Sequence, residues 1–147
     1  MLVVVDTSVL VDIFLKSRPR HADGKQLGRL LMDKNFTVRV PMHAMFELAS
    51  AMKNEKVTSH QDSSMPYNEE YTSDNGFRVE PIAIDEPFFE KYLDVNLPYL
   101  KGGDFIFLCM AKKDNALLIT EDNKLYARAK EAGVEVYRIQ EFLGAFQ

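Results

Sequence analysis

Short apolar runs alternate with amphipathic stretches along the chain, and this alternation predicts the fold. Five runs have β-strand character, most of them rich in Val and Ile: Leu2–Val5, Phe36–Val40, Val79–Ile84, Leu117–Thr120 and Val134–Ile139. The first and the fourth runs are apolar without alternation, as expected of strands that are covered on both faces.

Between these runs, apolar residues recur at the three-to-four-residue spacing of helices. The stripes are Leu27, Leu30 and Leu31; Met42, Met45, Phe46, Ala49 and Met52; Phe88, Phe89, Tyr92 and Leu93; and Leu125, Ala129 and Ala132 ahead of Gly133. Residues 105–111 are apolar on all sides, which predicts a helix buried in the centre of the protein. Strands that alternate with helices predict an α/β fold, here a three-layer α/β/α domain around a mainly parallel five-stranded sheet.

One segment departs from this alternation. Residues 57–76 consist mainly of Ser, Thr, Asn, Asp, Glu and Gln, and only four of the 20 are Val, Met or Tyr. We expect a polar surface loop or insertion there. It interrupts a domain rather than separating two, because 147 residues suit a single domain spanning residues 1–147.

Composition narrows the class of protein. The chain is 46% apolar and 27% charged, which is typical of a soluble globular domain and excludes collagen, coiled coil and wholesale disorder. Its formal net charge of −4 means that any contact with nucleic acid has to be local. The apolar residues 1–15 lack a basic n-region and contain Asp6 and Asp12, so we expect neither a signal peptide nor a membrane anchor, and a cytoplasmic location. The single cysteine, Cys109, excludes an intrachain disulfide and is expected to be a small buried side chain.

Acidic residues gather where the predicted strands end. Asp6 directly follows the first strand and Asp122 follows the fourth, while Asp104 opens the buried helix after Gly102-Gly103, which we interpret as a hinge. Glu47 lies two turns into the helix after the second strand. In an open α/β sheet the ligand crevice lies outside the carboxyl ends of the strands, so these four side chains are candidates for one site.

Each of these acids also has an ordinary structural interpretation. An aspartate at a strand-to-helix junction is a common N-cap, which stabilises the helix by about 1 kcal/mol, and Glu47 would be a solvated helix residue. Together, however, three or four carboxylates at one edge repel each other unless a divalent cation neutralises them. Carboxylate ligands favour Mg²⁺ or Mn²⁺ over zinc, so the pattern predicts a hard-metal site.

Four segments, in this order along the chain, carry a family resemblance. They are Val3–Leu10 with its Asp6-Thr7-Ser8 junction, Val40-Pro41 followed by Glu47-Leu48, Asp104–Lys112, and Leu118–Asp122 with Leu125. Over residues 2–143 they resemble the motifs of the PIN-domain nucleases, and among these the small toxins of type II toxin–antitoxin pairs. The resemblance implies a metal-dependent endoribonuclease that cleaves RNA, a homodimer, and a small antitoxin partner.

The resemblance also assigns residues. Asp6, Glu47, Asp104 and Asp122 would be the catalytic quartet that binds Mg²⁺ or Mn²⁺, and Ser8 and Thr120 would position this cluster or its waters. Such ions lower the pKa of a bound water and stabilise the leaving oxyanion, so no histidine or lysine base is required. Family members usually carry a helical clamp between the second and third motifs, and the polar residues 57–76 depart from that pattern.

Other polar residues have weaker assignments. Lys16, Arg18 and Arg20 begin the densest basic stretch and would either contact the RNA backbone or form a solvated face. The three histidines, His21, His43 and His60, share no spacing that predicts metal ligation or a catalytic triad.

Two other functions stay open at this point. One is an aspartyl-phosphate phosphotransferase or phosphatase with Asp6 as nucleophile, which Ser8 disfavours, since haloacid-dehalogenase-type enzymes carry a second aspartate there. The other is a catalytically silent nucleic-acid or protein interaction module whose acids are only helix caps. A measurement of metal binding would distinguish this interaction module, which needs no metal, from a nuclease.

Overall fold

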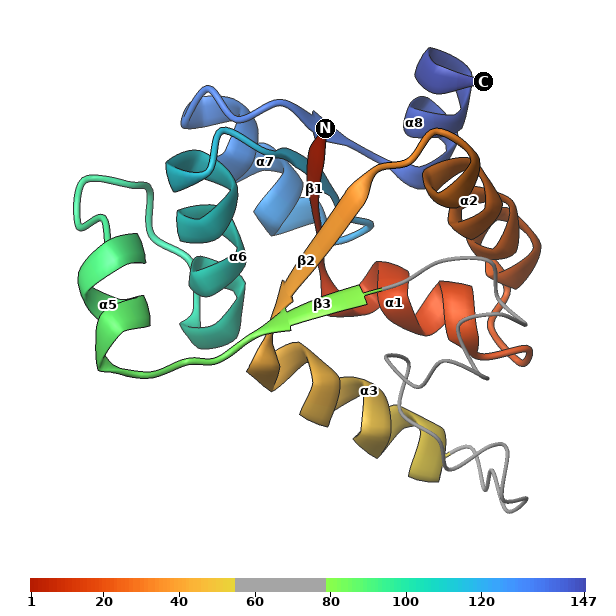
Figure 1. The fold of residues 1–147 in the computed structure, drawn as a ribbon, viewed down its shortest axis with the longest axis horizontal. Coiled ribbons are helices and arrows are strands. Elements are labelled where there is room, and N and C mark those ends of the chain that lie inside the picture. The colour runs from red at the N-terminus through yellow and green to blue at the C-terminus, as the bar shows by residue number, and fades with distance from the viewer. Residues whose placement is uncertain (55–78) are drawn as a thin grey trace.

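A five-stranded, all-parallel sheet forms the centre of the protein in the computed structural model, which describes residues 1–54 and 79–147 (Figure 1). The strands are β1 (Leu2–Val5), β2 (Thr37–Pro41), β3 (Val79–Ile82), β4 (Leu117–Ile119) and β5 (Val136–Tyr137), and their order across the sheet is β3-β2-β1-β4-β5. The predicted α/β fold and its five strands are confirmed. The last strand is shorter than predicted, because Ile139 already begins a helix.

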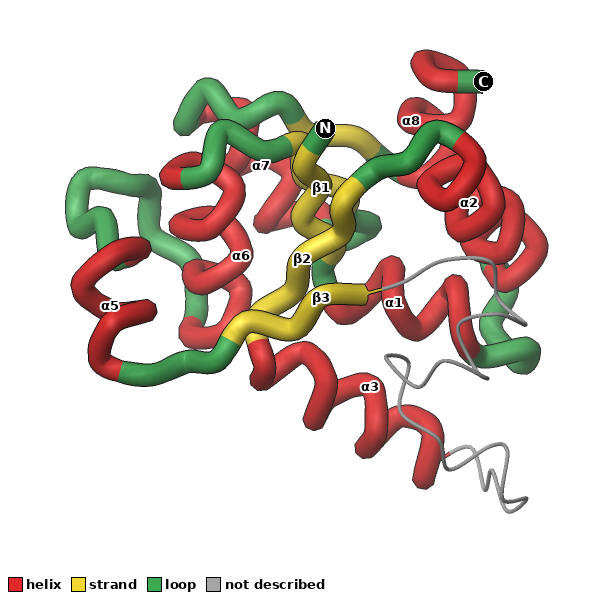
Figure 2. Tube along the Cα trace, viewed as in Figure 1, coloured by secondary structure: helices red, strands yellow, loops and turns green. Residues whose placement is uncertain are grey.

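Helices cover the sheet on both sides, as the three-layer prediction requires (Figures 1 and 2). On one side, α1 and α8 both pack against α2; on the other side, α5 and α7 both pack against α6. Helix α3 leads away from the carboxyl end of β2 and packs against α1. The described helices are α1 (Thr7–Phe14), α2 (His21–Asp33), α3 (Met42–Asn54), α5 (Glu86–Tyr92), α6 (Gly102–Lys113), α7 (Asn123–Glu131) and α8 (Ile139–Phe146).

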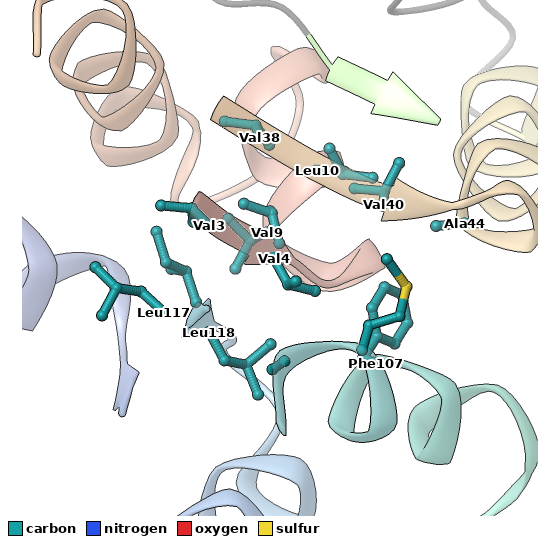
Figure 3. Close-up of a cluster of buried hydrophobic side chains, with 14 of the residues drawn as sticks. Val3, Val4, Val9, Leu10, Val38, Val40, Ala44, Phe107, Leu117 and Leu118 are labelled. Carbon is teal, nitrogen blue, oxygen red and sulfur yellow. The ribbon is translucent and has the colours of Figure 1, made fainter. Parts of the chain in front are cut away.

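Strand β1 is the most deeply buried part of the sheet. It pairs with β2 on one side, where Val3 lies opposite Val38, and with β4 on the other, where Val4 lies opposite Leu118. Val3, Val4 and Val5 have no exposed surface, and apolar side chains from both layers of helices pack around them (Figure 3). The apolar run without alternation therefore marks a strand covered on both faces, as predicted.

Only some of the side chains in the predicted helical stripes lie in the hydrophobic core. Met45 and Met52 are buried as predicted, but Phe46 on α3 is 74% exposed and Phe89 on α5 is 61% exposed. Both phenylalanines share a helical stripe with buried neighbours, but the spacing of a stripe does not say which side of it meets the core. Helices α1 and α8 were not predicted at all.

The strand order creates a switch point beside β1. The chain crosses from β1 to β2 and β3 on one side, then returns to β4 and β5 on the other side. At such a point the two neighbouring crossovers diverge, and α/β proteins commonly bind their ligands there, outside the carboxyl ends of the strands. Asp6 follows β1 at this edge, and Thr120 follows β4.

Two sequence-based expectations concern other parts of the chain. The polar loop or insertion at residues 57–76, with its departure from a helical clamp, lies outside the described residues. Among the helices of the described ranges, none has both the length and the apolar character to cross a bilayer.

Helices α1 and α2 approach each other most closely at Gly24. A Cβ atom at this position would lie 2.5 Å from the carbonyl oxygen of Asp12 and 2.8 Å from the amide nitrogen of Ile13. Because both atoms belong to the backbone, Gly24→Ala is expected to push the helices apart and to lower the free energy of unfolding by about 1–3 kcal/mol. Urea denaturation measures this change.

Gly144→Ala is the matched control for this substitution. Gly144 lies in α8, and a Cβ there would meet no atom within 4 Å. Alanine is the better helix former, so this variant is expected to gain up to about 1 kcal/mol. A loss of equal size in both variants would contradict the close approach of α1 and α2 at Gly24.

Candidate active site

Asp6 is the most constrained side chain at the carboxyl edge of the sheet. It lies between β1 and α1 and is only 3% exposed. Its Oδ1 accepts hydrogen bonds from the Ser8 hydroxyl at 2.7 Å and from the Val9 amide at 3.2 Å, and its Oδ2 accepts one from the Thr120 hydroxyl at 2.5 Å. Asp6 is therefore the N-cap of α1 and also the partner of the two hydroxyl groups that the resemblance placed beside it.

Burial has a large effect on this carboxyl group. Loss of hydration raises the pKa of Asp6 to about 6, because it outweighs the hydrogen bonds from Thr120, Ser8 and Val9, which lower the pKa. The negative charge of Asp122 raises it further. A cation close to Asp6 would reverse the shift.

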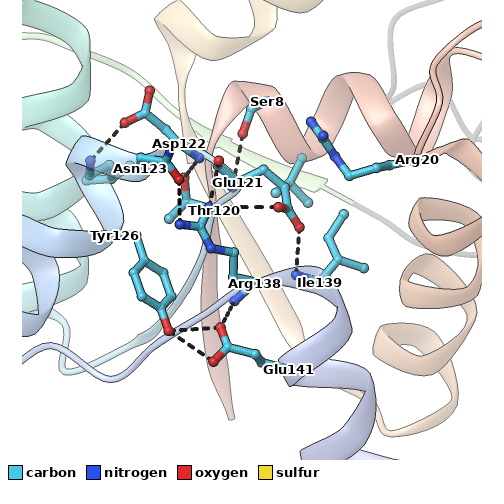
Figure 4. A network of polar contacts seen from close by, with 12 residues as sticks. Ser8, Arg20, Thr120, Glu121, Asp122, Asn123, Tyr126, Arg138, Ile139 and Glu141 are labelled. Carbon is cyan, nitrogen blue, oxygen red and sulfur yellow. Dashed lines mark hydrogen bonds and ion pairs between the residues drawn. The ribbon is translucent and has the colours of Figure 1, made fainter.

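Asp122 belongs to the same hydrogen-bonded unit at the end of β4. Its amide donates to the Thr120 hydroxyl oxygen at 2.9 Å, and its Oδ1 accepts from the Leu125 amide at 2.8 Å, so it caps α7. The next amide towards the N-terminus, that of Glu121, donates to the Ser8 hydroxyl oxygen at 3.3 Å (Figure 4). Two hydroxyl groups thus join the two strand-to-helix junctions that carry Asp6 and Asp122.

Asp104 does not cap its helix. Helix α6 begins at Gly102, which has a φ of 43°, and its N-cap is Lys101, whose side chain makes no capping hydrogen bond. The interpretation of Gly102-Gly103 as a hinge is therefore wrong: the two glycines form the first turn of the helix, and Asp104 is its third residue. This result removes the simplest structural explanation for the Asp104 carboxylate.

Asp104 lies within electrostatic reach of two other members of the quartet. Partial burial raises the pKa of Asp104, and the negative charges of Asp122 and Glu47 raise it further, whereas His43 and Lys124 lower it. Glu47 extends from α3 with 52% of its side chain exposed, and its Oε1 accepts a hydrogen bond from the Thr7 hydroxyl at 3.1 Å. The four acids predicted from the sequence therefore lie at one edge of the sheet.

These carboxylates do not form a closed ligand cage. Over residues 1–54 and 79–147, no three carboxylate, imidazole or thiolate side chains are close enough together to share one metal ion. The donor chemistry nevertheless fits a hard cation, because the set consists of carboxylate oxygens and the pKa values of Asp6 and Asp104 are raised by burial and by the negative charge of Asp122. A divalent ion would relieve both effects.

Sequence reasoning missed a second group of residues, which holds the loop that carries Asp122. The Arg138 guanidinium donates to the carbonyl oxygen of Glu121 at 2.8 Å and to Oδ1 of Asn123 at 2.6 Å, and it stacks on the ring of Tyr126 (Figure 4). The Glu121 carboxylate accepts from the Ile139 amide at 3.0 Å. These partners come from the loop after β4, from α7 and from the start of α8, so no local spacing in the sequence could have indicated them.

Arg20 is a member of the basic stretch whose charge interacts with acidic side chains at the edge of the sheet. Its Nε donates to Oδ2 of the fully buried Asp12 at 2.8 Å, and Arg18 lies 3.6 Å from the other oxygen of that carboxylate. The hydrogen bond from Arg20 to Asp12 raises the pKa of Arg20, and the charges of Glu121 and Asp6 raise it further. The structure places Lys16 on the exposed surface.

Fold and site together define an α/β protein with a group of acidic side chains at the carboxyl edge of its sheet, beside the switch point. A PIN domain model matches residues 3–131, and the chain therefore belongs to the PIN domain family, a family of nucleases. No curated protein matches the chain in sequence.

Several solved structures share this fold. VapBC2 from Rickettsia felis, bound to a DNA fragment from its promoter, is 19% identical with a TM-score of 0.63, covering 94% of this chain and 98% of that one. VapBC-1 from nontypeable Haemophilus influenzae is 18% identical with a TM-score of 0.57, covering 95% and 99%. FitAcB from Neisseria gonorrhoeae is 17% identical with a TM-score of 0.56, covering 94% and 98%.

The burial of Asp6 makes the stability of the fold depend on pH. The pKa of Asp6 is about 6 in the folded protein and 3.8 ordinarily, so the folded state binds more protons between these values. The free energy of unfolding is therefore expected to fall by about 2 kcal/mol as the pH rises from 4 to 7, and Asp6→Asn should lack this fall. Urea denaturation of both proteins in EDTA, at several pH values, measures the difference.

Asp33→Asn removes the same charge from an exposed side chain of α2 and controls for the change in net charge. Its stability should follow the wild-type curve. Parallel curves for wild type and Asp6→Asn would show that burial does not perturb the Asp6 carboxyl group.

Proposed function

We propose that this protein is a Mg²⁺- or Mn²⁺-dependent endoribonuclease that cleaves RNA phosphodiester bonds, and that it is the toxin of a toxin–antitoxin pair. The observation that carries the proposal is the set of four carboxylates at the switch point of a PIN domain, of which Asp104 has no capping role. A phosphodiester substrate is itself anionic, so an acidic site can act on it only together with a cation.

The roles of the residues follow from their contacts. Asp6, Glu47, Asp104 and Asp122 would hold the ion, which when bound supplies an activated water and neutralises charge on the phosphoryl group. Thr120 and Ser8 fix both oxygens of Asp6, and the α7 cap fixes one oxygen of Asp122. The hydroxyl of Thr7 restrains Glu47, the most exposed of the four.

RNA would approach the site past the start of α2. There Arg20 uses its Nε to bind Asp12, while 43% of its side chain stays exposed near the acidic edge. An anchored guanidinium of this kind binds a phosphate with little loss of conformational freedom. We include Arg18 and Lys16 as further contacts to the RNA backbone.

A small antitoxin and a second copy of the chain are the proposed protein partners. Support comes from the similarity of the fold to VapBC2, VapBC-1 and FitAcB. It also comes from exposed apolar side chains, since Phe89 on α5 and Val95 and Tyr99 after it are all more than half exposed, and exposed apolar side chains are what proteins use for association.

The phosphotransferase alternative gains no support from the geometry. Haloacid-dehalogenase-type enzymes carry a second aspartate two residues after the nucleophile, whereas here Ser8 stands at that position and donates its hydroxyl to Asp6. The silent interaction module explains Asp6 and Asp122 as caps, but it leaves Asp104 without a role.

Replacement of Asp104 by asparagine tests the metal site directly. Mn²⁺ at 100 times its dissociation constant is expected to raise the free energy of unfolding of the wild type by about 2.7 kcal/mol. Asp104→Asn should lose this gain and lose RNA cleavage, while it stays folded, because Asp104 does not cap α6. Thermal unfolding with and without Mn²⁺, and cleavage of a panel of structured RNAs, provide the two measurements.

Asp85→Asn is the control for a pure helix cap. Asp85 accepts a hydrogen bond from the Phe88 amide at 2.9 Å at the start of α5, and asparagine caps a helix about as well. This variant should keep both the gain from Mn²⁺ and the cleavage. An equal Mn²⁺ shift in Asp104→Asn would show that Asp104 is not a ligand, and cleavage that persists in EDTA would rule out metal dependence.

A salt titration tests the role of Arg20. With Mn²⁺ present and an RNA whose linkages resist cleavage, Arg20→Gln is expected to weaken RNA binding and to reduce the slope of log K against log salt by about one, because one phosphate contact is lost. Fluorescence anisotropy with a labelled RNA measures both quantities. Arg29→Gln removes the same charge from an exposed position of α2 and should leave the slope nearly unchanged. Identical slopes in the two variants would exclude an Arg20–phosphate contact.

A further inference from the structure

His43 lies in the site although its spacing in the sequence gave no sign of it. It is the second residue of α3, one turn before Glu47, and its ring packs against Phe107 of α6 with 5.2 Å between the ring centroids. The ring also lies against the backbone of Gly103, where a Cβ atom would be only 2.7 Å from Nε2. The first turns of α3 and α6 thus enclose the imidazole.

Both ring nitrogens of His43 are buried without a hydrogen-bond partner among the described residues. Such buried polar atoms are few in native proteins, because each loses its bond to water and gains nothing in return. The facing acceptor is Oε1 of Glu47, which lies 3.4 Å from Nε2, slightly beyond the N–H···O range of about 2.7–3.2 Å. A small rotation of the glutamate side chain would complete this bond.

Glu47 is the member of the quartet that most needs such a partner. Its side chain has three rotatable bonds and is half exposed, and the hydroxyl of Thr7 is bonded to the same oxygen, Oε1. Thr7 comes from the junction after β1, and His43 from the helix of Glu47 itself. The Thr7 hydroxyl and the His43 ring, which come from two different helices, therefore both face one carboxylate oxygen, Oε1.

We propose that His43 is a positioning residue, whose Nε2–H donates to the Glu47 carboxylate and holds it ready for the divalent cation, with Gly103 providing the space for the ring. This inference rests on the proposed function. Hydrogen bonds to ligating side chains typically change metal affinity by about 10- to 100-fold. The glycine is required because any side chain at position 103 would displace Nε2.

A matched pair of substitutions tests the hydrogen bond. Glutamine and methionine have the same length, but only glutamine carries an N–H group near the position of Nε2. His43→Met is therefore expected to weaken Mn²⁺ binding by about 10- to 100-fold, while His43→Gln stays close to the wild type. Gly103→Ala should weaken binding like His43→Met. Isothermal titration with Mn²⁺ measures the affinities, and thermal unfolding in EDTA verifies that each variant is folded.

The outcomes separate this inference from the proposed function. Unchanged Mn²⁺ affinity in His43→Met overturns the inference and leaves the metal site in place. An equal loss in His43→Met and His43→Gln also overturns it, because packing of the ring and not the N–H group would then be responsible. A wild type that binds no Mn²⁺ overturns both. If His43→Met does not fold, Gly103→Ala replaces it in the test. Wild-type Mn²⁺ affinity in Gly103→Ala then overturns the inference.

Discussion

The rest of the site depends on the buried hydrogen bond between Asp6 and Thr120. It ties the end of β1 to the end of β4 across the switch point, and the same carboxylate begins α1. Burial of this carboxylate opposes its ionisation, as its raised pKa shows, so the fold is less stable near neutral pH than it would be with a neutral group. Asparagine would cap α1 equally well, but it has only one acceptor oxygen and could not also accept the hydrogen bond from Thr120.

A strand or helix could be predicted from the sequence where both of its faces are buried, or where one face is buried and the other is clearly polar. The valines of β1 and the leucines of β4 lack alternation, and they form the buried centre of the sheet. Helix α1 could not be found in this way, because six of its eight residues are buried and no polar face marks its period. The side chain of Phe46 fits a helical stripe but points to solvent, since the spacing does not say which face meets the sheet.

Site residues could be predicted from the sequence only where an acidic side chain also follows a predicted strand of the sheet. Asp6 directly follows β1, and Asp122 comes soon after β4, which pairs with β1, so a local pattern placed the two acids together. The environment of His43 comes from Gly103 and Phe107, about 60 residues further along the chain, and the anchor of Glu121 comes from Arg138. Such contacts arise from tertiary packing alone, which is why spacing assigned His43 no role.

The distribution of charge around the edge explains how an acidic protein could bind RNA. Arg20 and Arg18 pair with the buried Asp12, and Arg138 is bound to the loop beside Asp122, so much of the nearby positive charge is already compensated. A phosphate that approaches Asp6, Asp104 and Asp122 without a cation therefore meets repulsion. Under the proposed function, RNA and the divalent ion must bind cooperatively, each raising the affinity of the other by the same factor. The acidic edge would thus bind RNA well only in the metal-loaded state, which is the state able to cleave it.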